Sequence, residues 1–336
     1  MSIISIQPLG FQWQTYDPFL FCAYHHDHYP RGNGKSGPAV SLAGRHIGMD
    51  FEIRDGFRMY HGDKVPGFPA HPHRGFETIT IVQQGLVDHA DSLGAAGRYG
   101  QGDVQWLTAG RGIQHSEMFP LVHSDAPNPL LLFQLWLNLP GKSKMAPPNF
   151  LMFWGRELPR AYETDAAGRE IRVEITAGDY GGTRALAPPP HSWAADPANH
   201  VAVWVIDLAA EAEWQLPAAA SGLNRALYFF EGSEAQFDNM TVKAMHSLRL
   251  RSDQPLTIRN GGKPARLLLL QGKPINEPVA QHGPFVMNTR DELLQAFTDY
   301  QRDHFGGWPW PRADQVHEGR DRFASMADGS ETHPES

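Results

Sequence analysis

Short apolar runs separated by glycine and polar turns dominate residues 76–137. Among them are FETITIV, which ends at Val82, and LLLFQLWLNLP, which begins at Leu130. Runs of this length, rich in β-branched and aromatic residues and bounded by turn residues, are typical of antiparallel strands in a sandwich or barrel. The pattern therefore predicts an all-β domain in this part of the chain.

A similar pattern of short apolar runs and turns follows a polar, proline-containing segment at residues 141–150, GKSKMAPPNF. Beyond it, VAVWVIDL, RALYFFEG and ARLLLLQG again indicate strands joined by turns. A segment without strand periodicity between two β-rich regions is typical of a linker. We expect an N-terminal domain of residues 1–150 and a C-terminal domain of residues 151–311.

One helix is predicted near the end of the chain. Thr289 and Glu292 have the spacing of a capping box, in which each side chain bonds the backbone N–H of the other residue. An apolar stripe follows at helical spacing, formed by Leu293, Leu294, Phe297 and Tyr300. Residues 312–336 are polar, and we expect them to be disordered.

Composition and charge narrow the functional classes. The 336 residues carry a formal net charge of -8 without any basic run, so direct binding of nucleic acid is not expected. Cys22 is the only cysteine, which excludes an internal disulfide and a multi-thiolate zinc site. No basic leader precedes an apolar core, and no run reaches the length of a membrane span. We expect a cytoplasmic protein without a membrane partner.

Two pairs of potential metal ligands lie about forty residues apart, each at a spacing of two. Side chains two positions apart in a strand face the same way, so His71 and His73 would point together, as would His115 and Glu117. Glu77 shares the parity of the first pair if that strand is continuous. Three imidazoles and a carboxylate suit a divalent ion such as Fe, Mn, Ni or Cu and are also compatible with Zn.

An alternative is that these residues are ordinary surface histidines, because the chain has 17 histidines and an isolated His-x-His occurs by chance. The second pair favours a metal site. The other histidines have no such partners, and we expect structural or surface roles for them. They include the cluster His25, His26 and His28 beside Asp27, expected in a solvated loop, and the isolated His191, His200, His246 and His282.

Several longer motifs resemble the pirins, a family of the cupin superfamily. They are DPFL at 17–20, HPHRGFET at 71–78, GDVQWLTAGRGIQHSEM at 102–118, FQLWLNLP at 133–140, and EPVAQHGPFVMNT through DYQRDHFGGWPW at 277–310. The resemblance extends from about Asp17 to Trp310. It implies a bicupin, with two antiparallel jelly-roll β-barrels packed face to face and a short C-terminal helix.

The resemblance also implies one metal, held in the N-terminal barrel by His71, His73, His115 and Glu117. The metal of pirins is usually iron, so Fe(II) is the first expectation, with Mn, Ni, Co, Cu or Zn as alternatives. Other cupins place a ligating carboxylate near the position of Glu77. The pirin pattern assigns that role to Glu117, and Glu77 is expected to support the site without coordinating the metal.

Two functions follow from the resemblance. Some pirins resemble quercetin 2,3-dioxygenases, which would make the partners a small planar phenolic substrate and dioxygen, with Glu117 as the catalytic base. The alternative is a redox-sensitive iron-binding regulatory protein that binds a transcription factor or a metabolic enzyme through the same metal site. A structural metal in an inert bicupin is the third and least favoured hypothesis, because the four ligands leave coordination positions open.

Overall fold

The computed structural model describes residues 2–334, and its backbone contacts divide the chain into two compact units. The first unit combines the residues up to Cys22 with Leu158–Asn276, and the second combines Ala23–Glu157 with Glu277 and the residues after it. Neither unit is a continuous stretch of sequence. The division therefore differs from the expected boundaries at residues 150 and 311, because N-terminal and C-terminal segments each join a unit that lies far away in the sequence.

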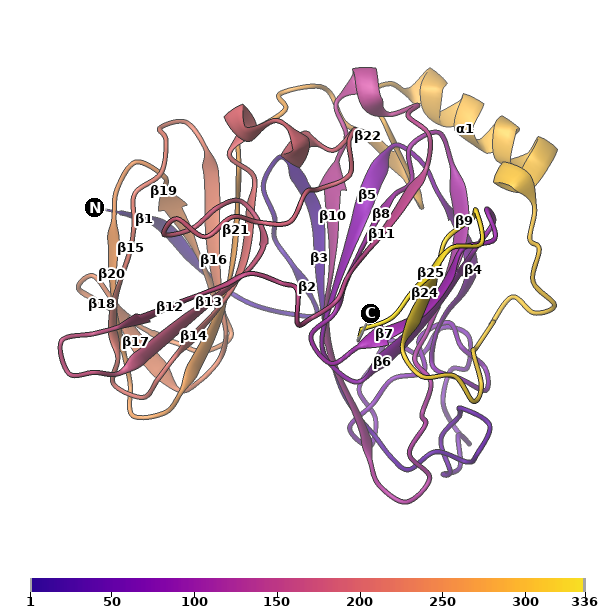
Figure 1. Cartoon of the computed structure of the whole chain (residues 1–336), viewed down its shortest axis with the longest axis horizontal. Coiled ribbons are helices and arrows are strands. Elements are labelled where there is room, and N and C mark those ends of the chain that lie inside the picture. The colour runs from indigo at the N-terminus through magenta and orange to yellow at the C-terminus, as the bar shows by residue number, and fades with distance from the viewer. Residues whose placement is uncertain (1, 335–336) are drawn as a thin grey trace. The chain divides into compact units, whose positions relative to one another are not determined.

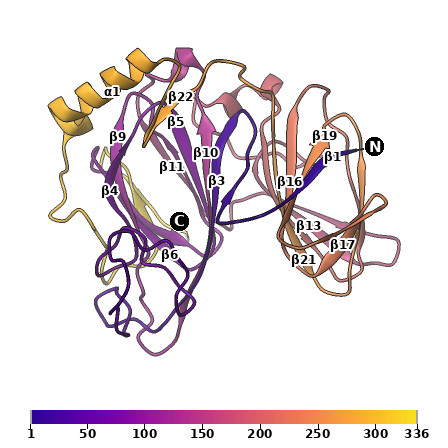
Figure 2. The ribbon, with the colours of Figure 1, turned by 180° about the vertical axis from the view of Figure 1, so that it is seen from behind.

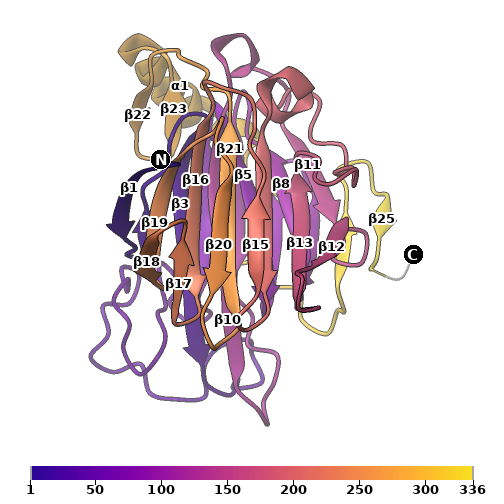
Figure 3. The same cartoon turned by 90° about the vertical axis from the view of Figure 1, so that its left-hand side faces the viewer.

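The first unit consists of two antiparallel sheets, whose strands are seen face-on in Figure 3. The strands of these sheets are β1 (Ile3–Pro8), β12 (Arg160–Thr164), β13 (Glu170–Ala177), β14 (Ala202–Leu208), β15 (Glu213–Leu216), β16 (Asn224–Glu231), β17 (Glu234–Phe237), β18 (Met240–Lys243), β19 (His246–Arg251), β20 (Leu256–Asn260) and β21 (Ala265–Gly272). The short strand β2 (Gln12–Trp13) belongs to neither sheet. Its short 3-10 helices are η2 (Trp193–Ala195) and η3 (Pro197–Asn199). The seven-stranded sheet has the order β1-β19-β16-β21-β14-β13-β12, and the four-stranded sheet has the order β15-β20-β17-β18.

The second unit also has two principal sheets (Figure 1). Its elements are β3 (Phe19–Tyr29), β4 (Gly67–His73), β5 (Phe76–Gln84), β6 (Leu86–Asp91), β7 (Ala96–Gly100), β8 (Val104–Thr108), β9 (Ile113–Met118), β10 (Asn128–Asn138), η1 (Gly141–Ser143), β11 (Asn149–Phe153), β22 (Ala280–His282), β23 (Phe285–Met287), α1 (Arg290–Asp303), η4 (His304–Gly306), β24 (Phe323–Ser325) and β25 (Glu331–Thr332). One sheet contains β11-β8-β5-β10-β3 in that order, and the other has the order β25-β24-β7-β6-β9-β4. β22 and β23 form a separate two-stranded ribbon.

The apolar faces of the two sheets form the core of each unit. In the first unit, alternate residues such as Trp204 on β14, Leu227 and Phe229 on β16 and Leu269 on β21 belong to one buried cluster. This alternation is the pattern that the sequence predicted for strands with one face in a core. The mostly β architecture is confirmed, but the sheets remain open rather than closing into barrels.

Helix α1 begins where the capping box predicts. The Thr289 side chain accepts a hydrogen bond from the Glu292 N–H over 3.2 Å, and the Glu292 carboxylate accepts one from the Thr289 N–H over 2.8 Å. Leu293 packs with Phe285 in a small core beside β23, whereas Leu294 is 58% exposed, so only part of the predicted stripe is buried. Figure 2 shows the helix from the opposite side. Within residues 2–334 no helix is both long and apolar enough to cross a membrane.

The C-terminal segment is structured up to residue 334, contrary to the expected disorder. β24 pairs with β7, and Phe323 and Ala324 are almost fully buried. The Arg322 guanidinium contacts the buried Asp103 carboxylate over 2.9 Å. A few well-placed apolar and ionic contacts thus hold a segment whose average composition is polar. Residues 335 and 336 lie outside the described residues.

The histidine cluster near the N-terminus lies on strand β3 and not in a solvated loop. Its alternate residues His25 and Asp27 are buried, while the other two histidines are exposed. The Asp27 carboxylate accepts hydrogen bonds from the Arg58 guanidinium over 2.9 Å and from the Tyr60 hydroxyl over 2.6 Å. These partners allow a carboxylate to occupy the core.

Candidate metal centre

Two neighbouring strands of the second unit carry the candidate metal ligands. His71 and His73 lie on β4, and His115 and Glu117 lie on β9, which is the antiparallel neighbour of β4. His71 is directly opposite His115 in this pairing, and an irregularity of the register separates Phe68 from His71. Strand alternation and cross-strand pairing together bring the two pairs to one place.

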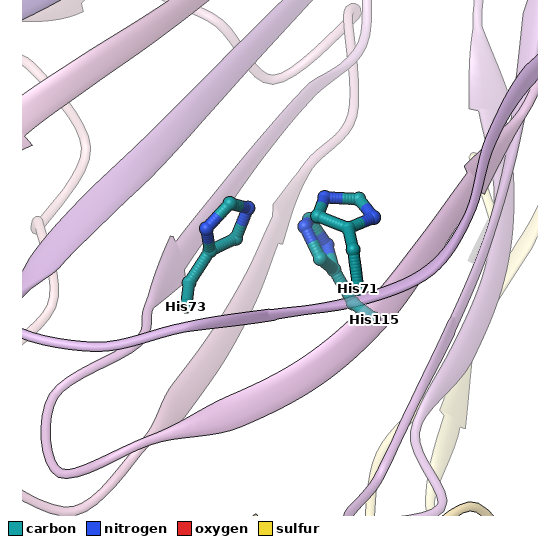
Figure 4. Close-up of side chains that lie close together, drawn as sticks. All are labelled: His71, His73 and His115. Atoms are coloured by element: carbon teal, nitrogen blue, oxygen red, sulfur yellow. The ribbon is translucent and has the colours of Figure 1, made fainter. Parts of the chain in front are cut away.

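The three imidazoles form one compact group (Figure 4). Each of His71, His73 and His115 offers a ring nitrogen, and the three nitrogens lie within 4.8 Å of one another. The ring centroids are separated by 4.7 Å between His71 and His73, 4.5 Å between His71 and His115, and 4.9 Å between His73 and His115. This spacing is that of side chains that could hold a single metal ion.

The hydrogen bonds of the rings favour metal binding. Nδ1 of His71 donates to the Pro69 carbonyl over 2.9 Å, which leaves Nε2 without a proton and free to act as a ligand. Nδ1 of His73 makes a longer contact, 3.4 Å, with the Pro284 carbonyl. Both ring nitrogens of the fully buried His115 lack a hydrogen-bond partner among the described residues. A metal would satisfy one of these otherwise costly buried atoms.

The electrostatics of the site keep the rings neutral. Burial lowers the pKa of His71 to about 4, and it lowers the pKa values of His73 and His115 well below their usual range. The other imidazoles of the cluster lower the pKa of His115 further, because a second positive charge nearby would be unfavourable. A neutral imidazole is the form that binds a metal, so the three rings fit a metal ion at neutral pH.

Glu117 lies beside this group. Its Oε2 is 3.7 Å from Nε2 of His115 and accepts a hydrogen bond from the Gln134 amide over 2.9 Å. The Thr80 hydroxyl lies 3.1 Å from Oε1 of Glu117 and 2.6 Å from Oε1 of Gln134, and its single proton can be donated to only one of them at a time. Burial raises the pKa of Glu117. The carboxyl group is therefore suited to gaining and losing a proton beside the histidines.

Glu77 does not share the strand of His71 and His73, and the expectation that it supports the site stays a prediction. β4 and β5 belong to different sheets, and the chain turns between them at Gly75, whose φ is 88°. Because Thr80 on β5 reaches Glu117, alternation places Glu77 on the opposite face of that strand. There its Oε1 accepts a hydrogen bond from the Thr108 hydroxyl over 2.7 Å. The turn breaks the continuity on which the parity argument depended.

Sequence reasoning missed a fourth buried histidine next to the group. His89 on β6 lies opposite Glu117 in the pairing of β6 with β9, and its ring centroid is 5.5 Å from that of His115. Its Nε2 is 3.2 Å from the Asp91 carboxylate, which holds the ring in place. The motif DHAD at residues 88–91 places His89 and Asp91 two positions apart, on one face of a strand, and this spacing could have indicated them.

Two aromatic side chains lie next to His73 in the histidine group. The Phe76 ring lies 5.0 Å from His73 and the Trp136 ring 5.4 Å from it, measured between centroids. The two aromatic rings are 4.2 Å apart. Trp136 and His71 each retain partial exposure, so the site has both an apolar wall and access to solvent.

The antiparallel sheets and the histidine cluster are those of a cupin-type protein whose side chains could hold a metal ion. The Pirin family model matches residues 6–137, and the Pirin C-terminal cupin domain matches residues 203–306. The chain belongs to the pirin family, as its motifs indicated. The first matched region contains all three clustered histidines as well as Glu117.

Individual relatives agree with this assignment. A Pseudomonas aeruginosa protein named "Putative quercetin 2,3-dioxygenase" is 39% identical over 239 residues, which cover 71% of this chain and 79% of the relative. A pirin-like protein of Solanum lycopersicum is 40% identical over 238 residues, covering 70% of this chain and 75% of the relative. The crystal structure of a quercetin 2,3-dioxygenase from Acinetobacter baumannii superposes with a TM-score of 0.71 at 25% identity, covering 91% of this chain and 98% of that one.

Proposed function

We propose that this chain is a metal-dependent dioxygenase that opens the heterocycle of a flavonol such as quercetin. The observation that carries the proposal is the position of Glu117, a buried carboxyl group with a raised pKa, 3.7 Å from one of three clustered imidazoles. The likeness to the quercetin 2,3-dioxygenase of Acinetobacter baumannii supports the choice of reaction. The overall reaction joins dioxygen to the flavonol and releases carbon monoxide.

We infer that His71, His73, His115 and Glu117 hold one divalent transition metal, with Fe(II) as the first candidate. Imidazole and carboxylate donors also suit Mn, Ni, Co, Cu and Zn, so the donor set alone does not choose among them. When bound, the metal would act as a Lewis acid that lowers the pKa of the substrate hydroxyl, and it would hold the substrate close to dioxygen. The two carbonyl contacts of His71 and His73 keep those rings oriented toward it.

Glu117 acts in this proposal as the base that accepts the proton of the flavonol 3-hydroxyl. A raised pKa makes its carboxylate a better proton acceptor than an exposed one. The Gln134 amide and the Thr80 hydroxyl hold the carboxylate in position from the neighbouring sheet. Phe76 and Trp136 provide apolar ring surfaces beside which a planar phenolic substrate can lie.

A single experiment tests the proposal. Protein depleted of metal and reconstituted under anaerobic conditions is mixed with quercetin and oxygen, and loss of the flavonol absorbance and release of carbon monoxide are followed together. We expect catalytic turnover with at least one of the six metals. Absence of turnover with all of them, in protein shown to contain the metal, would reject the dioxygenase and favour a regulatory role for the site.

A further inference from the structure

The first unit contains a cavity of about 680 Å³ that has no part in the metal centre. It opens among the loops at one end of the two sheets, and its walls are mostly small or apolar. Much of the wall consists of alanine and proline, including Ala177, Ala202, Pro188 and Pro217, together with the aromatic side chains of Tyr180 and Trp204. A volume of this size suits a small organic molecule.

A buried arginine lines this cavity. Arg225 on β16 is 2% exposed, and alternation places it on the same inward face as Leu227 and Phe229 of the core. Its Nη1 donates to the Pro217 carbonyl over 2.7 Å, but its Nε has no hydrogen-bond partner among residues 2–334. Burial lowers the pKa of Arg225 to about 10, and no acidic residue in the described part of the chain offsets this effect.

The residue opposite Arg225 is also incompletely bonded. Strands β16 and β21 are neighbours in their sheet (Figure 3). Gln271 on β21 pairs with Arg225 in register, lines the same cavity and is 6% exposed. Its amide nitrogen donates to the His200 carbonyl over 3.2 Å, while its Oε1 has no partner in the described part of the chain. The floor of the cavity therefore presents a cation and an amide, both with unused hydrogen-bonding capacity.

The acidic residues of the cavity are at its rim and do not neutralise Arg225. Asp179 and Asp196 are exposed, and their carboxylates accept hydrogen bonds from the backbone N–H groups of Ala185 and Ala198 over 3.0 and 2.9 Å. No ion pair involves Arg225 within residues 2–334. A buried cation without a counter-ion is costly for the folded protein, and it is expected where an external anion completes the site.

We propose that this cavity binds a small organic carboxylate, whose anionic group meets Arg225 and Gln271 and whose apolar body lies against the alanine- and proline-rich wall. The guanidinium has the planar geometry that pairs with a carboxylate through two parallel hydrogen bonds. This site is independent of the histidine cluster, since its lining residues all belong to the first unit and the cluster belongs to the second. The proposal therefore does not rest on the dioxygenase activity.

Isothermal titration calorimetry of the full chain with benzoate, benzamide and inorganic phosphate tests the proposal. Benzamide has the same shape as benzoate without the charge, and phosphate has charge without an apolar body. We expect benzoate to bind once per chain and at least about tenfold more tightly than either control. Equal affinity for benzoate and benzamide, tighter binding of phosphate, or no binding of benzoate would overturn the proposal.

Substitutions of Arg225 test whether benzoate binds in this cavity. Arg225→Met should weaken benzoate binding by at least about tenfold and leave the melting temperature unchanged or higher, since it removes an unpaired buried charge. Arg251→Met, at an exposed arginine of β19, is the matched control and should bind benzoate like the parent protein. Undiminished binding by Arg225→Met would overturn the proposal. If that variant does not fold, Arg225→Lys serves instead, because it keeps the charge and loses the paired geometry.

A final experiment distinguishes binding in this cavity from binding at the histidine cluster. Protein stripped of metal with a chelator should bind benzoate with the same affinity as metal-loaded protein. Loss of benzoate binding on removal of the metal would place the ligand at the histidine cluster and overturn the assignment to this cavity. Failure of quercetin turnover would leave the calorimetric result unaffected, so the two proposals fail independently.

Discussion

Oε2 of Glu117 lies 3.7 Å from Nε2 of His115, a residue two positions earlier on the same strand. The pair combines an imidazole that has no hydrogen-bond partner among the described residues with a carboxyl group that receives a hydrogen bond from Gln134. His115 is therefore a potential ligand next to Glu117, for which we propose two roles, as a ligand and as a base. Measuring metal content and turnover in variants of the histidines and of Glu117 should separate metal binding from proton transfer.

Replacement of His73 by alanine should abolish stoichiometric metal binding. Each imidazole belongs to a group held ready by the fold, and loss of one ligand should lower metal affinity by at least about 100-fold. Elemental analysis of the purified variant after reconstitution measures the effect. His191→Ala, at an exposed histidine of the first unit, is the control and should keep its metal. Full metal content in His73→Ala would refute the ligand assignment.

Glu117→Gln should lose quercetin turnover while the protein remains folded. Loss of a general base lowers kcat by about 10² to 10⁴, and the amide is too weak a base to replace it. Glu77→Gln is the matched control, because Glu77 is also a buried carboxyl group but lies on the opposite face of its strand. We expect it to retain kcat within about twofold. Comparable losses of kcat in both variants would show that the role of Glu117 is structural.

His25 should make the protein sensitive to mild acid. Burial, with a smaller contribution from Arg58, lowers its pKa from 6.5 to about 3. The unfolded chain therefore binds this proton at a higher pH than the folded chain does. Between these two values the free energy of unfolding falls as the pH falls, by up to about 1.4 kcal/mol per pH unit for this one group.

Replacement of His25 by phenylalanine should make that decline shallower. The new ring can pack in the aromatic surroundings of Tyr60, Phe68 and Phe119, whose ring centroids lie 4.9, 5.9 and 5.9 Å from that of His25. Urea unfolding of the metal-free protein at about pH 6.5 and about pH 5 measures the difference. Parallel pH dependence in the parent and His25→Phe proteins would exclude His25 as the source.

Phe323→Ala should destabilise the second unit although the residue lies close to the end of the chain. The side chain is 1% exposed, and its removal leaves a cavity that costs about 3–5 kcal/mol. Thr332→Ala, at an exposed position of β25, should change stability by no more than about 0.5 kcal/mol. Thermal and denaturant unfolding of the two variants are compared. Equal stabilities would mean that β24 contributes nothing to folding.

Local signals in the sequence predicted the features that depend on neighbouring residues. The start of α1 follows from two residues three positions apart, and the structure contains both hydrogen bonds of the capping box. The convergence of His71, His73 and His115 follows from strand alternation together with one cross-strand pairing. The roles of these histidines and of Glu117 as ligands stay predictions until the metal is measured.

Features that depend on contacts between residues far apart in the sequence could not be predicted from local patterns. Burial of Asp27 requires Arg58 and Tyr60, which no spacing in the sequence connects to it. Burial of Phe323 requires the edge of β7 as a surface on which to pair. The parity of Glu77 with His71 and His73 required a continuous strand, and the turn at Gly75 places Glu77 in a different sheet. The average polarity of a segment and the alternation of residues along a strand do not predict the structure where one specific long-range contact determines it.

Strand β1 pairs with β19, so that Ile6 lies opposite Leu248. During synthesis β1 emerges from the ribosome long before β19 and has no partner until β19 has been made. A gene divided at residue 150 would give one fragment with an unmatched strand and another whose β19 has an open edge, which is a site for aggregation. The protein must therefore be expressed as one polypeptide if either unit is to be isolated in its native form.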